Sequence, residues 1–79
     1  MNKRSVSIRG HRTSFSLEDE FWNELKAIAG ARKVSVAQLV TQVDLRRGEE
    51  ENLSSALRLY VLRDLKSKLQ AAQSNAQDA

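Results

Sequence analysis

The sequence contains no cysteine, no proline and a single histidine, His11, in 79 residues. Without cysteine the chain forms no disulfide, and with one histidine it has no Cys/His zinc site, so we expect neither a metal nor a cofactor. A chain this short hides only about 60% of its unfolded surface, and such domains are usually reinforced by disulfides, a metal or self-association. Self-association is the reinforcement that remains, which predicts a dimer.

Long apolar runs are also missing. No stretch approaches the roughly 20 residues of a membrane span. The basic opening Met1–Arg4 is followed by Ser5–Arg9 and not by the apolar segment of a signal peptide. Together with the absence of cysteine, which fits a reducing compartment, these features predict a cytoplasmic protein.

Charge is distributed unevenly along the chain. Thirteen basic residues against ten acidic ones give a net charge of +3. Residues 1–17 carry Lys3, Arg4, Arg9 and Arg12 and no acidic residue. A basic N-terminal segment fits a polyanionic partner such as DNA, and a solvated, flexible start is the alternative.

Residues 11–17 have the alternation of a strand with two unlike faces. Thr13, Phe15 and Leu17 alternate with Arg12, Ser14 and Ser16. Val6 and Ile8 fall on positions of opposite parity, which places a kink or bulge at Gly10. We therefore expect a strand at about 11–17, preceded by an arm or a second, separate strand.

Three helices are expected after this strand. The first covers about 18–32, because acidic residues fill its first turn and apolar residues then recur at helical spacing. Ser35 is a suitable N-cap for the second helix, which ends at Gly48. Asn52 is a suitable N-cap for the third helix, which runs to about residue 69. Leu59, Leu62 and Leu69 give the third helix a second apolar strip, which indicates packing between two bodies. The predicted divisions are an arm or short extended segment (1–10), a strand and two helices (11–48), an acidic joint with the third helix (49–69) and a disordered tail (70–79).

A single strand leaves its backbone groups unpaired. Either Ser5–Arg9 folds back on it, or the partner strand comes from a second molecule about a two-fold axis, and we favour the second arrangement. Arg12, Ser14 and Ser16 would then face outward from each chain. A two-stranded ribbon fits the major groove of B-form DNA, where such side chains meet base edges.

The sequence resembles the ribbon-helix-helix family of DNA-binding proteins over 12–22, 25–29 and 34–40, and its opening, 3–18, resembles a bacterial subgroup with a basic N-terminal arm. The resemblance implies a mainly α fold with one short N-terminal strand, and an intertwined homodimer with an intermolecular antiparallel ribbon. It also implies a transcriptional regulator, often a repressor. By this similarity the base-reading residues are Arg12, Ser14 and Ser16, and Ser35 with Val36 clamps a phosphate.

Further DNA contacts are expected from the basic residues around this core, namely Lys3, Arg4 and Arg9 in the arm and Lys33 beside the second helix. Family members commonly have glycine at the position of Lys33, where the backbone takes positive φ. Lysine in that conformation is expected to cost about 1 kcal/mol, and a different turn that uses Gly30 or Ala31 is the alternative.

Two other functions compete with a ribbon that binds DNA. In a helix-turn-helix, the second helix would present Gln38, Thr41 and Gln42 to the groove. In a protein-interaction module, or an antitoxin-like protein, the third helix would dock a partner. No nucleophile–base set, glycine-rich phosphate loop or metal-ligand spacing is present, so we do not expect an enzyme. Trp22 is expected to serve packing.

Overall fold

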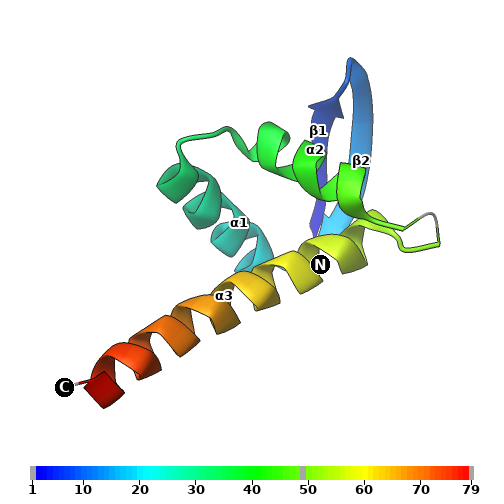
Figure 1. Cartoon of the computed structure of the whole chain (residues 1–79). Helices are drawn as coiled ribbons and strands as arrows, with labels where there is room; N and C mark the ends of the chain where they lie inside the picture. Colours follow the sequence, from blue (N-terminus) through cyan, green and yellow to red (C-terminus); the bar gives the residue numbers. More distant parts are fainter. Residues whose placement is uncertain (1, 49, 79) are drawn as a thin grey trace.

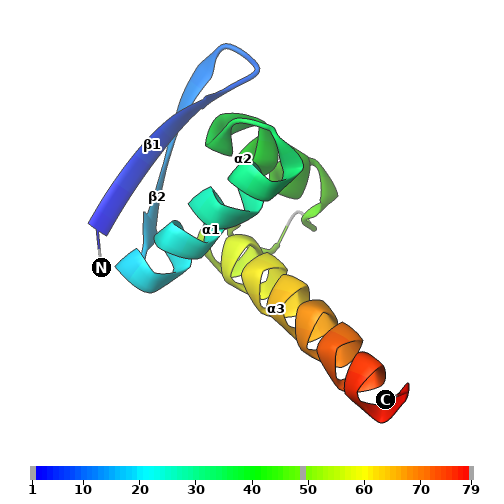
Figure 2. The ribbon, with the colours of Figure 1, turned by 90° about the vertical axis from the view of Figure 1, so that its left-hand side faces the viewer.

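The computed structural model describes residues 2–48 and 50–78, of which 74–78 are described by their backbone alone. Two strands, β1 (Asn2–Ile8) and β2 (His11–Leu17), form an antiparallel hairpin. Three helices follow, α1 (Asp19–Arg32), α2 (Val36–Arg46) and α3 (Leu53–Asp78). The hairpin lies on one side of the helices, and α3 extends beyond the rest of the chain (Figures 1 and 2).

The predicted strand at 11–17 is confirmed, but its partner in this structure is β1 of the same chain. Of the two arrangements considered, the single chain adopts the one in which the segment before Gly10 folds back on this strand, so the expected fold with one N-terminal strand is corrected to two strands. The physical reason is a two-residue turn: Arg9 (φ 51°) and Gly10 (φ 81°) both have the positive φ that a type I′ hairpin turn requires. This turn also resolves the parity difference, because it pairs Val6 with Thr13 and Ile8 with His11 on one face.

The helix boundaries follow the capping residues of the sequence. Ser35 caps α2 through a capping box: its hydroxyl accepts from the Gln38 N–H at 3.0 Å, and its N–H donates to the Gln38 side-chain oxygen at 2.8 Å. The Asn52 side chain accepts from the Ser55 N–H at 2.8 Å at the start of α3. The helix continues through Asp78, beyond the end near residue 69 that the sequence predicts.

The core lies between the hairpin and the helices. Each element contributes to it: Ile8 from β1, Phe15 and Leu17 from β2, Leu25, Ile28 and Ala29 from α1, Leu39, Val40 and Val43 from α2, and Leu53, Ala56, Leu57 and Val61 from α3. In contrast, four leucines of α3 are 40–58% exposed: Leu59, Leu62, Leu65 and Leu69. We call these four the leucine stripe. No helix in the described residues is long and apolar enough to cross a membrane.

Candidate nucleic-acid interface

The hairpin has two chemically different faces because its register places directly opposed residues on the same side. One face packs on the helices through Ile8, Phe15 and Leu17. The other, which we call the outer face, is made of three cross-strand pairs: Lys3 with Ser16, Ser5 with Ser14, and Ser7 with Arg12. All six of these residues are exposed, and none is acidic.

The three predicted base-reading residues, Arg12, Ser14 and Ser16, therefore lie together on the outer face, beside Lys3. Sequence reasoning missed Ser5 and Ser7, which complete this face from β1. Predicting a tight turn at Arg9–Gly10 from the sequence would have identified these two serines, because such a turn pairs odd-numbered residues of β1 with even-numbered residues of β2.

Arg4 lies on the opposite face from Lys3, so the structure does not bring it into the arm contacts expected of it. Its guanidinium is 3.2 Å from an Asp19 carboxylate oxygen and 4.8 Å from the centre of the Trp22 ring. Trp22 also contacts Phe15, with the ring centres 6.2 Å apart. Arg4 and Trp22 thus join the hairpin to the start of α1, in keeping with the packing role expected of Trp22.

The other predicted contacts to the DNA backbone lie at two turns. Arg9 is exposed in the hairpin turn. Lys33 caps the end of α1 in the left-handed conformation (φ 59°, ψ 41°), which confirms the backbone state expected at this position. The capping box occupies the hydroxyl and N–H of Ser35, so the first-turn amides that it does not use are those of Val36 and Ala37.

The residues of the helix-turn-helix alternative are placed differently. The Gln38 side chain is held in the capping box, and the Thr41 hydroxyl donates to the Ala37 carbonyl at 2.7 Å. Both border a groove of about 320 Å³ between α2 and Ser7 of β1. The third predicted contact residue of this alternative, Gln42, is exposed. Its side chain takes part neither in the capping box nor in the hydrogen bond to the Ala37 carbonyl.

An ion pair holds the junction of β2 and α1 against α3. Arg58 Nε lies 2.8 Å from a Glu18 carboxylate oxygen. Hydrogen bonding from Arg58, followed by hydrogen bonding to backbone, lowers the pKa of Glu18 below its ordinary value. Glu18 lies between β2 and α1, two residues after the outer-face residue Ser16. The ion pair therefore fixes the position of the end of the hairpin relative to α3.

The comparisons with known proteins gave one result. The sequence model of the ribbon-helix-helix domain matches residues 1–65. The searches of curated proteins and of solved structures gave no match. The matched segment contains the hairpin, α1, α2 and the first half of α3, and its family consists generally of DNA-binding transcription regulators. This chain belongs to the ribbon-helix-helix family.

Proposed function

We propose that this chain binds double-stranded DNA in a sequence-specific manner as a homodimer and regulates transcription. The observation that carries the proposal is the outer face of the hairpin, which is exposed, polar and without acidic residues. A two-stranded ribbon of this kind has the dimensions of the major groove. The proposal assigns no catalytic role to the chain.

On this face the cationic side chains stand at opposite ends, and serines lie between them. The Ser7–Arg12 pair and the Lys3–Ser16 pair lie four residues apart along the strands, which is about 13 Å at the rise of a β-strand. Arg12 is suited to bidentate hydrogen bonds with guanine, whereas serine donates to or accepts from any base. We assign base recognition mainly to Arg12, with Ser14 and Ser16 adding contacts of lower selectivity.

Contacts to the DNA backbone are assigned to Arg9, Lys33 and the start of α2. Lysine and arginine neutralise phosphates, and the first-turn amides of a helix favour an anion. Val36 would contribute its backbone N–H, and Ser35 would hold that first turn in place through its capping box. These contacts orient the ribbon and carry no sequence information themselves.

The homodimer in this proposal shares its ribbon between two copies. A strand from the partner would then take the place that β1 occupies beside β2, which requires the hairpin to open at Arg9–Gly10. Two features support such an exchange. The turn is short and holds a non-glycine residue at positive φ, and strained short connections favour strand exchange. Exchange also recovers the same strand pairs between copies, which makes it a low-cost route to a dimer.

The test starts from sheared genomic DNA of the source organism, retained on the purified protein at about 150 mM salt and sequenced. A shared palindromic motif is expected. On that motif, Arg12→Ala should weaken binding by roughly 1–3 kcal/mol and relax base preference, with a smaller effect on random DNA. Arg46→Ala, which removes the same charge away from the outer face, is the matched control. Retention without any motif, or equal losses for the two variants, would contradict sequence-specific recognition by the outer face.

The leucine stripe of α3 supports a second candidate function, the docking of a partner protein. Leu62 and Leu69 are 50% and 58% exposed, and the exposed bases Lys66 and Lys68 lie among and beside the stripe. Lys68 is paired with Asp64, whereas Lys66 has no ion pair among the described side chains. Because a second copy would bring the Lys66 charges together, the charge pattern favours an acidic amphipathic partner. Leu62→Ser with Leu69→Ser should leave the oligomeric state unchanged in sedimentation. A tetramer that these changes reduce to a dimer would assign the stripe to self-association.

A further inference from the structure

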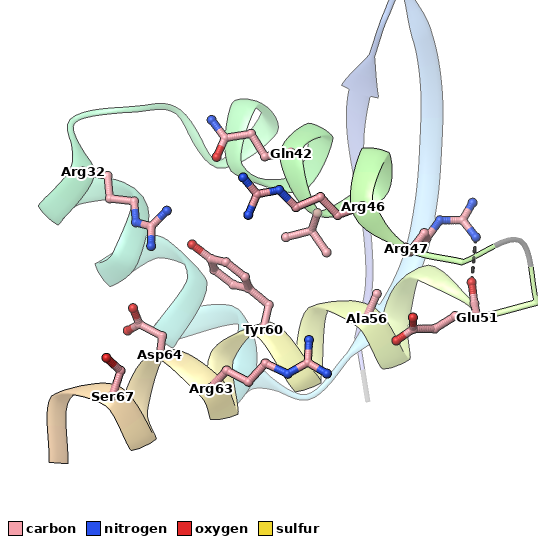
Figure 3. A pocket seen from close by; sticks show the side chains of 11 residues that line it. Arg32, Gln42, Arg46, Arg47, Glu51, Ala56, Tyr60, Arg63, Asp64 and Ser67 are labelled. Atoms are coloured by element: carbon pink, nitrogen blue, oxygen red, sulfur yellow. Dashed lines mark hydrogen bonds between the residues drawn. The ribbon is translucent and has the colours of Figure 1, made fainter. Parts of the chain in front are cut away.

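A cavity of about 380 Å³ lies where three helices meet, and none of the residues that line it belongs to the hairpin. It is bounded by the last turn of α1, the second half of α2 and the middle of α3 (Figure 3). Four arginines line it: Arg32 from α1, Arg46 and Arg47 from the end of α2, and Arg63 from α3. The cavity has the volume of a small-molecule site, for which about 300–1,000 Å³ is usual.

Three of these four arginines form no ion pair with the described side chains. Arg47 is paired with Asp44 at 2.6 Å, and the lining residue Asp64 is paired with Lys68 at 2.9 Å. Among the described side chains, those of residues 2–48 and 50–73, no carboxylate lies within ion-pair distance of Arg32, Arg46 or Arg63, although Glu51 lines the cavity as well as Asp64. A guanidinium group is a cation with several N–H donors in a planar fork. The cavity therefore presents several cationic hydrogen-bond donors to whatever enters it.

Tyr60 provides a second and independent observation. Its hydroxyl oxygen is buried and has no hydrogen-bond partner among the described residues. Arg32 holds the ring in place, with its guanidinium carbon 5.5 Å from the ring centre. The hydroxyl end points toward Arg32 and Gln42 (Figure 3). Buried polar groups are nearly always hydrogen-bonded, so an unpartnered hydroxyl at the edge of a cavity indicates a missing acceptor.

We propose that this cavity binds a small organic anion that carries at least two negative charges, as phosphate or carboxylate groups. Guanidinium groups match the planar and tetrahedral oxyanions of both classes with paired hydrogen bonds. Arg46 and Arg63 would hold the charged groups from opposite sides, and the Tyr60 hydroxyl would donate the additional hydrogen bond. The apolar part of the ligand would rest on Val43 and Ala56, which also line the cavity.

This site is separate from the proposed DNA interface. The outer face of the hairpin is directed away from the helices, and no hairpin residue lines the cavity. A duplex seated on the outer face would therefore leave the cavity open. The binding of a small anion does not depend on whether the chain binds DNA.

The test is isothermal titration of the full chain with pyrophosphate and with citrate, at constant ionic strength. We expect saturable binding of at least one of the two, and the better ligand identifies the phosphate or the carboxylate class. Arg46→Gln and Arg63→Gln should each weaken it about 10- to 100-fold, the effect of losing a charge-assisted hydrogen bond. Arg12→Gln removes the same charge on the outer face and should leave the affinity unchanged.

Tyr60→Phe separates binding from folding. Because the hydroxyl has no hydrogen-bond partner among the described residues, its removal should not lower the urea midpoint of unfolding, yet it should weaken anion binding several-fold. The proposal would be overturned if neither pyrophosphate nor citrate gave a saturable heat of binding. It would also be overturned by an equal loss of affinity in Arg12→Gln, since that would reveal attraction by net charge, or by an unchanged affinity in Tyr60→Phe.

Discussion

The hairpin turn allows a sharp test of both the fold and the shared ribbon. At Arg9 the backbone has φ 51°, a conformation that costs most residues about 1–2 kcal/mol and that asparagine tolerates better. Arg9→Asn should therefore stabilise the closed hairpin. Arg9→Gln is the matched control, because it loses the same charge and differs from Arg9→Asn by one methylene group, but lacks the asparagine preference for this conformation.

We expect the Asn variant to exceed the Gln variant by about 1 kcal/mol in the free energy of unfolding, measured by urea titration at equal chain concentration. Gly10→Ala should act in the opposite direction by a similar amount. The added methyl group meets no atom within 4 Å, so its cost is that of the backbone at φ 81° alone.

The same variants act on the proposed dimer. If two hairpins must open to share a ribbon, stabilising each closed hairpin by about 1 kcal/mol weakens the dimer by about 2 kcal/mol, or roughly 30-fold in Kd. Sedimentation equilibrium measures this change. Equal free energies of unfolding for Arg9→Asn and Arg9→Gln would refute the positive φ at residue 9 and with it the closed turn. A more stable Asn variant with an unchanged dimer Kd would refute the opening of the hairpin on dimerisation.

Three further perturbations follow from the packing. Lys33→Gly should raise the free energy of unfolding by about 1 kcal/mol, because Lys33 is left-handed, and a fall in urea titration would contradict that geometry. Leu57→Ala should lower it by about 2–5 kcal/mol, since Leu57 is fully buried; a smaller loss by the same method would mean that α3 packs loosely. Arg58→Gln should raise the pKa of Glu18 in an NMR titration. Because folding lowers this pKa, the ion pair stabilises the fold above the unfolded-state pKa, and the difference between wild type and variant should shrink as the pH falls through the folded-state value. A variant whose Glu18 titrates unchanged would contradict the assigned cause.

Local signals in the sequence were sufficient for β2 and for the starts of the helices. Ser35 and Asn52 act as caps through side-chain contacts to residues three positions away, which a sequence pattern can show. The sequence left two partners open for β2, and β1 was not the favoured one because Arg9–Gly10 is not one of the glycine or asparagine pairs that usually mark a type I′ turn. With that turn unrecognised, Arg4 could not be assigned to the inner face.

The cavity could not be predicted for a different reason. Arg32, Arg46 and Arg63 are each about fifteen residues apart and belong to three different helices. Only the packing of α1, α2 and α3 brings them to one place. In the sequence each is an ordinary exposed arginine near a helix end or on a helix surface, and nothing distinguishes it from Lys26 or Lys66.

The projection of α3 has a consequence for helix–coil equilibrium. The helix spans 26 residues, about 39 Å at the usual rise, but its buried positions end at Val61. The portion beyond residue 64 has only its own hydrogen bonds and the ion pair of Lys68 with Asp64 to stabilise it, and isolated helices of about 12–15 residues are marginal in water. Its helical population is therefore set by what contacts the leucine stripe. Carbon chemical shifts at Ala71 and Ala72 should move further toward helical values whenever a partner or a second copy covers Leu65 and Leu69.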